Sequence, residues 1–197
     1  MALEPVAARR RRVALAGHGD DVSVVRPALA DTDAFIRSLA LGALARLGTL
    51  EDTDLVDALA DPDAAVRVRA AELAARRPGV SLLGSLDDPD PLVQEQAAWA
   101  SGERDPAEPG AVAALGHLAG EASDPLVREA AVAALGAVGD VDGLPAILAA
   151  TTDRPAVRRR AVLALAPFEG PEVDAALERA RSDKDRQVRQ AAEDLSG

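Results

Sequence analysis

Aliphatic and polar residues follow one another along this chain in a block that returns at nearly constant intervals. One clear copy, Asp61 to Ala70, reads Asp-x-Asp-x-x-Val-Arg-x-x-Ala. Its aliphatic anchor recurs at intervals of 30, 27, 34, 30 and 31 residues, as Ile36, Val66, Val93, Val127, Val157 and Val188. A fixed period of this length is typical of stacked repeats, because each unit can bury its apolar face only against its neighbours. The pattern therefore predicts an array of about six units.

Two helices are expected in each unit. From the anchor onward, apolar residues recur at steps of three, four and seven, as one buried helical face requires. This periodicity predicts second helices at 34–47, 64–77, 91–101, 125–138, 155–166 and 186–195. Shorter apolar stretches before each motif predict the first helices, so that the repeats span about 20–48, 50–78, 79–104, 107–139, 140–169 and 171–195.

Residues 1–19 lack the motif and are predicted to form an N-terminal capping helix, with its helical part at 2–16. The run Arg9 to Arg12 supplies the polar outer face that a terminal repeat needs. The alternative is a tag for an anionic partner or a membrane surface, and so short a basic run rarely holds a membrane alone.

An aspartate stands three residues before most anchors, where its carboxylate can accept hydrogen bonds from the first free N–H groups of the second helix. These predicted caps are Asp33, Asp63, Asp90, Asp124 and Asp185. The fifth repeat has Arg154 there and Asp153 one place earlier, so we expect a looser or shifted helix start. Glycines predicted to end helices are Gly48, Gly79, Gly102, Gly139 and Gly170.

The third repeat ends its helix early. A Pro- and Gly-rich connector, 102–110, follows Trp99 and explains the interval of 34 residues. We expect either a bend with a functional role or a tolerated surface insertion there.

Positions +3 and +6 from each anchor face away from the core, because a helix turns by 100° per residue. The only Trp of the chain, Trp99, falls on this outward face. Exposed Trp and Arg are frequent in interface hot spots, although Trp99 could instead fold sideways into the end of its helix. The hypothesis is a partner-binding patch made of Arg69, Glu72, Gln96, Trp99, Arg160 and Leu163.

Composition narrows the function classes. The chain is 48% hydrophobic but only 2% aromatic, which predicts a core of Ala, Leu and Val between closely packed helices. The net charge is 22 − 33 = −11, and this repels nucleic-acid phosphates. There is no Cys, and the two histidines, His18 and His117, make no metal motif. No catalytic residue, cofactor or metal site is predicted.

No stretch is long and apolar enough for a membrane span, and the apolar run after Arg12 is too short for a signal peptide. We therefore expect a cytoplasmic monomer.

With its motif returning six times in phase, the sequence resembles HEAT repeats, and in particular the short bacterial HEAT-like repeats of the phycobilisome (bilin) lyase type. The resemblance covers about 20–195 and implies a right-handed α-solenoid of about six helix pairs. It also implies a ladder of hydrogen bonds between repeats, formed by the five cap aspartates and by Arg37, Arg67, Arg128, Arg158 and Arg189. Gln94 interrupts that series in the third repeat.

The resemblance implies a non-enzymatic scaffold or adaptor that binds a protein or peptide on the concave face lined by the second helices. The alternatives are a bilin-lyase-like accessory subunit and, with less support from the charge, a nucleic-acid-binding protein. The hydroxylase branch of the family requires repeated His-Glu pairs, whereas His18 and His117 are followed by Gly19 and Leu118. The run Arg158 to Arg160 is explained by one ladder Arg and two solvated ones, or else by a site for an acidic peptide or phosphate.

Overall fold

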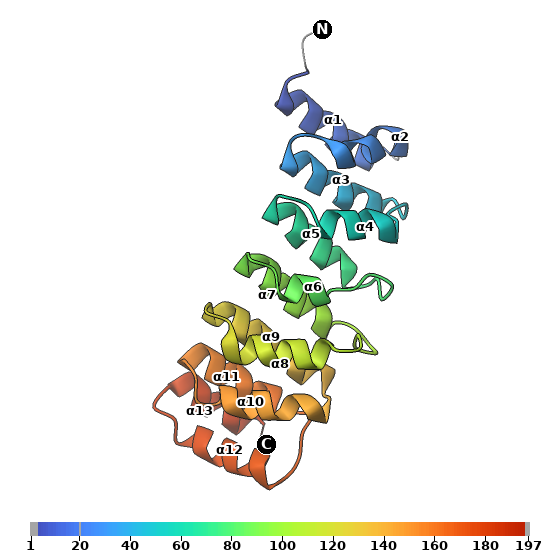
Figure 1. Ribbon diagram of the computed structural model, residues 1–197. Helices are drawn as coiled ribbons and strands as arrows, with labels where there is room; N and C mark the ends of the chain where they lie inside the picture. Colours follow the sequence, from blue (N-terminus) through green and yellow to red (C-terminus); the bar gives the residue numbers. More distant parts are fainter. Residues whose placement is uncertain (1–3, 20, 196–197) are drawn as a thin grey trace. The chain divides into compact units, whose positions relative to one another are not determined.

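The computed structural model describes residues 4–19 and 21–195, and every regular element within these ranges is helical (Figure 1). The chain divides into two compact units, residues 1–81 and 82–197, which are described separately. Helices occur in pairs in both units, two pairs after an N-terminal helix in the first and four in the second. The predicted all-α repeat fold is confirmed for the described residues.

The first unit is built around α3, which contacts α1, η1 and α5, while α4 packs on α5. Helix α1 packs on α3 and has Val13 and Ala16 among its buried residues. The elements of the unit are α1 (Val6–His18), α2 (Val22–Val25), η1 (Arg26–Ala30), α3 (Ala34–Arg46), α4 (Asp52–Leu59) and α5 (Ala64–Ala74).

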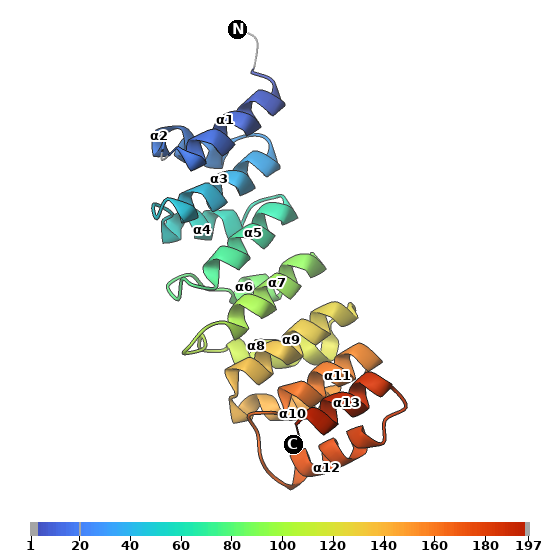
Figure 2. The ribbon, with the colours of Figure 1, turned by 180° about the vertical axis from the view of Figure 1, so that it is seen from behind.

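The second unit has its second helices in one layer and its first helices in another, and α9 contacts α7, α8 and α11 (Figures 1 and 2). The last second helix, α13, packs on α11 and α12. The elements are α6 (Leu83–Leu86), α7 (Pro91–Gly102), α8 (Ala111–Glu121), α9 (Pro125–Val138), η2 (Val141–Gly143), α10 (Leu144–Ala150), α11 (Pro155–Ala164), α12 (Pro171–Arg181) and α13 (Arg186–Asp194).

The anchors and the alanines four residues after them form the core of each repeat. All six anchors are at most 1% exposed, and the six alanines are fully buried: Ala40, Ala70, Ala97, Ala131, Ala161 and Ala192. Small side chains at this position let neighbouring helices approach closely, so that a core with few aromatics can still be close-packed. Where Leu44, Ala74, Leu135 and Leu165 are buried in other repeats, the third repeat has Ser101, whose hydroxyl donates to the carbonyl of Ala97 at 2.8 Å.

The predicted helix caps are confirmed. Each of the five cap aspartates accepts a hydrogen bond from a backbone N–H of the first turn, at 2.8 to 3.1 Å. The expected shift at Arg154 is wrong: α11 begins at Pro155, two residues before its anchor, as the other second helices do. Pro155 presets the backbone of the first helical turn, so this start keeps its register without a side-chain cap.

Two of the five predicted glycine stops end their helices as expected, whereas Gly79 and Gly170 lie five and six residues beyond the ends of α5 and α11. Gly48 and Gly139 follow their helices with φ of 69° and 68°, the left-handed conformation that glycine adopts without strain. Gly102 instead lies within α7 and faces Ala134 of α9. The connector after it is held by Glu108, which accepts hydrogen bonds from Arg104 and from the backbone N–H of Leu82, both at 3.0 Å.

Candidate functional site

Arginines one residue after the anchors link consecutive repeats through a ladder of ion pairs. Arg128 shows the geometry: its Nε and Nη2 donate to Asp153 at 2.6 and 2.9 Å, and its Nη1 donates to the carbonyl of Ala122 at 2.7 Å. One guanidinium thus joins its own loop to the loop of the next repeat. The same two-sided contact occurs in the pairs Arg37–Asp61 and Arg158–Asp183.

The carboxylate assigned to this ladder from the family resemblance was wrong. The cap aspartates accept from their own helices, whereas the ladder uses the aspartate one or two residues earlier. Asp183, for example, pairs with Arg158 and also accepts from the backbone N–H of Asp185 at 2.7 Å. In this repeat the two aspartates of the Asp-x-Asp motif therefore have separate tasks: Asp183 binds the arginine of the preceding repeat, and Asp185 caps the helix.

The arginine run of α1 extends the ladder to the N-terminal helix. Arg9 donates to both oxygens of Asp31 at 2.9 and 3.0 Å. Arg10 pairs with Asp33 and lies over the ring of Phe35, 4.7 Å from its centroid. These contacts support the capping interpretation of the run, since the charges are directed at the first repeat.

Pairing lowers the pKa of the ladder aspartates. Hydrogen bonds from the guanidinium are the largest cause for Asp31, Asp153 and Asp183, whose pKa values all lie below 3.8. For Asp61, burial raises the pKa, but hydrogen bonds from Arg37 and from the backbone outweigh it, so the pKa is lowered as well.

These shifts predict a loss of stability in acid. A carboxylate whose pKa is lower in the folded chain stabilises it fully above the unfolded value of 3.8, and this contribution disappears as the pH falls through the folded pKa. We expect the ladder contribution to be constant from about pH 5 to 7 and to decline below about pH 4. Thermal unfolding of the wild type and of Asp183→Asn across this range tests the prediction. The gap between the two melting temperatures should narrow in acid, and a constant gap would contradict it.

One junction of the second unit lacks both members of the ladder. Gln94 stands where the other repeats have Arg, and Ala122, five residues before its anchor, stands where all the other repeats except the fifth have Asp. We call these two positions the broken rung. The predicted interruption at Gln94 is confirmed, and its partner position Ala122 was missed by the sequence analysis. Comparing the residues four and five before each anchor would have found it, because only this repeat has no Asp at either position.

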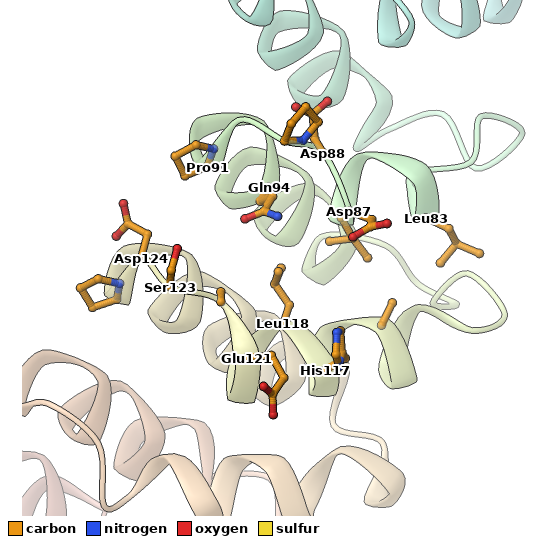
Figure 3. A pocket seen from close by; sticks show the side chains of 15 residues that line it. Leu83, Asp87, Asp88, Pro91, Gln94, His117, Leu118, Glu121, Ser123 and Asp124 are labelled. Atoms are coloured by element: carbon orange, nitrogen blue, oxygen red, sulfur yellow. The ribbon is translucent and has the colours of Figure 1, made fainter.

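A solvent-open groove lies at the broken rung, between α6 and α7 on one side and α8 with the start of α9 on the other (Figure 3). Its volume is about 960 Å³. We call it the rung groove. Gln94 and Leu118 point toward each other across it, with Asp87 and His117 near one end and Ser123 and Asp124 near the other (Figure 3). Its lining includes four carboxylates and neither Lys nor Arg.

Large apolar side chains are exposed on the second helices α7 and α9. Leu92 is 62% exposed, Trp99 47% and Leu126 55%. Leu92 and Trp99 are seven residues apart and so share one face of α7, while Leu126 begins the equivalent face of the adjacent α9. We call these three residues the apolar face.

The six residues predicted to bind a partner are divided between the two units. In the first, Arg69 of α5 pairs with Glu72 at 2.5 Å. In the second, Gln96 and Trp99 lie on α7, the first half-buried and the second exposed. On α11, Arg160 approaches Glu129 at 3.4 Å, and Leu163 is half-buried against the cluster around Val188. Their role in binding stays a prediction.

Leu92 and Leu126 were missed by the sequence analysis. Both lie one residue before the anchor of their helix. Because a helix turns by 100° per residue, this position lies on the same outward face as the positions three and six residues after the anchor. Including the position directly before each anchor in the predicted outward face would have found them.

Two kinds of feature are absent from the described residues, 4–19 and 21–195. They contain no group of three or more His, Cys, Asp or Glu side chains placed to hold a metal ion. Nor does any helix in these ranges have the length and apolar character needed to cross a membrane.

Comparison with known proteins supports the repeat fold. Among solved structures, the chain is similar to an engineered protein at 20% identity, with a TM-score of 0.59 and coverage of 89% of this chain and 94% of that one. It is similar to Escherichia coli YibA at 19% identity, TM-score 0.68, covering 95% and 75% of the two chains. A designed armadillo repeat protein in complex with the peptide (KR)4 has 18% identity, TM-score 0.61 and 98% coverage of both chains. At these identities the likeness concerns the fold alone.

Curated protein sequences give no significant match. A family model of HEAT repeats matches residues 53–136, 80–155 and 131–196, which together cover more than half of the chain. With the helix pairs and the recurrent motif already described, this match shows that the chain belongs to the HEAT-repeat family.

Proposed function

We propose that this protein is a non-enzymatic scaffold that binds a protein or peptide on the outward face of its second helices. The observation that carries the proposal is the apolar face, where Leu92, Trp99 and Leu126 are each about half exposed or more. Large apolar side chains on neighbouring helices are costly to leave in water, and such patches mark interaction surfaces. The helical-repeat fold supports this, because stacked repeats present extended binding surfaces.

Trp99 is the proposed centre of this surface. A Trp side chain buries a large apolar area in an interface, and Trp and Arg are enriched among hot spots. Gln96 lies on the same helix, and Arg160 and Leu163 are proposed to add contacts from α11. Arg69 and Glu72 occupy the equivalent outward positions of α5 in the first unit, where we propose a further contact.

The partner is proposed to be a protein segment with basic character, because the chain carries a net charge of −11. The designed armadillo repeat protein that resembles it in fold is bound to a (KR)4 peptide. That complex supports a peptide as one kind of ligand that such a fold accommodates.

Trp99→Ala is expected to weaken partner binding by about tenfold or more, as truncation of an interface hot spot does. The melting temperature should stay nearly unchanged, because the side chain is already 47% exposed. Partners captured from a lysate with the wild type would be identified and then titrated against both proteins, with thermal unfolding measured in parallel.

The matched control is Val141→Ala, which removes an apolar side chain that is 68% exposed on η2, outside the apolar face. It should bind the partner as the wild type does. Equal affinity of the Trp99 variant and the control would refute the proposal, and a large fall in melting temperature for the Trp99 variant would mark this residue as part of the core.

The same capture distinguishes the two alternatives. A bilin-carrying protein among the partners would favour a lyase-like accessory role, for which this chain offers no particular supporting contact. A DNA shift at low salt that disappears as salt is raised would favour nucleic-acid binding.

A further inference from the structure

We propose that the rung groove binds the arginine side chain of an extended segment of a partner protein. The site is separate from the apolar face and does not depend on Trp99. The argument starts from the other junctions of this chain, which show how two consecutive repeat loops hold a guanidinium.

At the intact junctions, the guanidinium lies across two loops and has acceptors on both. Arg158 donates to the carbonyl of Asp153 in its own loop at 2.8 Å and to both carboxylate oxygens of Asp183 in the next loop at 2.7 and 2.9 Å. Its side chain is only 9% exposed. The spacing between consecutive repeat loops in this unit therefore accommodates one planar, bidentate cation.

At the broken rung the chain supplies no such cation. Gln94 is shorter than Arg and uncharged, and Ala122 has no acceptor in its side chain. The neighbouring guanidinium, Arg128, reaches the loop of Ala122 from the next junction and is engaged there with two carbonyls and with Asp153. A groove of about 960 Å³ lies where the intact junctions are bridged.

The lining of the groove matches an arginine in charge and in shape. Asp87 lies near one end of the groove, and Asp124, which also caps α9, lies near the other (Figure 3). The carboxylates of Asp88 and Glu121 point away from the groove (Figure 3). Leu86 and Leu118 give an apolar floor on which the methylene stem of an arginine can pack. A planar guanidinium can bind one carboxylate through two parallel N–H groups, which a lysine ammonium does less well.

The groove is open to solvent, and this favours a side chain carried by a peptide over a free small molecule. An open site buries too little of a small ligand to hold it, while a peptide adds contacts of its backbone and of the residues beside the arginine. The excess of acidic side chains in the lining disfavours phosphate and other anions.

The test uses the full-length chain and the peptide acetyl-Leu-Arg-Leu-amide, followed by backbone amide shifts in NMR spectra. We expect saturable shifts confined to residues 87–94 and 117–126. The citrulline counterpart, which has the same shape without the charge, should bind at least about tenfold more weakly, as loss of a charge-assisted contact predicts. The lysine counterpart should also bind more weakly. Equal binding by either counterpart would overturn the proposal.

The double variant Gln94→Arg/Ala122→Asp restores the rung and should occupy the groove with the protein's own guanidinium. Peptide affinity is expected to fall by about tenfold or more, while the melting temperature stays equal or rises. A control with the same charge change, Gln187→Arg/Ser182→Asp, alters exposed positions in the last repeat and should bind as the wild type does. Unchanged affinity in the rung-restoring variant would refute the assignment.

Asp87→Asn provides a test that does not depend on folding of the double variant, since Asp87 is exposed at the edge of the groove. This substitution should lower the affinity for the arginine peptide several-fold and leave the affinity for the citrulline peptide unchanged. Trp99→Ala should bind the arginine peptide as the wild type does. The experiments therefore test partner binding at Trp99 and arginine binding in the rung groove independently, and either proposal can be refuted without the other.

Discussion

Replacing Asp183 by alanine is expected to lower the free energy of unfolding by about 2 to 3 kcal/mol. The substitution leaves the guanidinium of Arg158, whose side chain is only 9% exposed, without the carboxylate that accepts two of its hydrogen bonds. It also removes the acceptor of the backbone N–H of Asp185. Urea unfolding followed by circular dichroism measures the change, which corresponds to a fall in melting temperature of about 4 to 12 °C.

A control for this prediction is Glu178→Ala. Its ion pair with Arg181 is within one helix and largely solvated, with side chains 71% and 43% exposed, so its loss should change stability by less than about 1 kcal/mol. The double variant Arg158→Met/Asp183→Leu removes both charges and should recover part of the lost stability, because no charge is then left buried without a partner, while the N–H of Asp185 still lacks its acceptor. If Asp183→Ala and Glu178→Ala had equal effects, the ladder would not be a source of stability.

Gly136→Ala is expected to destabilise the chain by about 1 to 3 kcal/mol, although alanine is the better helix former. A Cβ atom at Gly136 would lie 2.7 Å from both Cα and Cβ of Ala164, closer than van der Waals contact allows. Backbone atoms cannot move aside as a flexible side chain does, so α9 and α11 must separate. This separation would loosen the core of the fourth and fifth repeats.

The control is Gly120→Ala, also within a helix but with no atom near the added methyl group. It should stabilise the chain by about 0.5 to 1 kcal/mol through helix propensity alone. The two substitutions are chemically the same, but they are expected to change the stability in opposite directions. A stabilising effect at both positions would show that the close approach of α9 and α11 does not constrain the packing.

Helix positions could be predicted from the sequence because their causes are local. The second helix expected at 125–138 is observed at Pro125–Val138, and its anchor Val127 is 1% exposed. The capping hydrogen bond of Asp124 joins residues two apart, so no tertiary information is needed to foresee it. Even at Arg154, where a shifted start was expected, the spacing from proline to anchor set the register of α11.

The surfaces were predictable only in part. Trp99 was placed on an outward face by helical geometry, and it is exposed. Leu92 and Leu126 share that direction but were overlooked, because the outward positions were counted only after the anchor. The division of labour within Asp-x-Asp was assigned wrongly, because both aspartates are chemically able to cap a helix and only one is close enough to the preceding repeat.

The sequence by itself determined the helix pairs, their caps, the buried anchors and the absence of an arginine at Gln94, since each depends on residues within one or two helical turns. Only the tertiary structure decided which carboxylate each arginine reaches, that Gly102 and Gly136 allow neighbouring helices to touch, and that a groove lies beside Gln94 and Ala122. Those features join residues about 25 to 30 positions apart, and their geometry depends on how closely one repeat packs on the next.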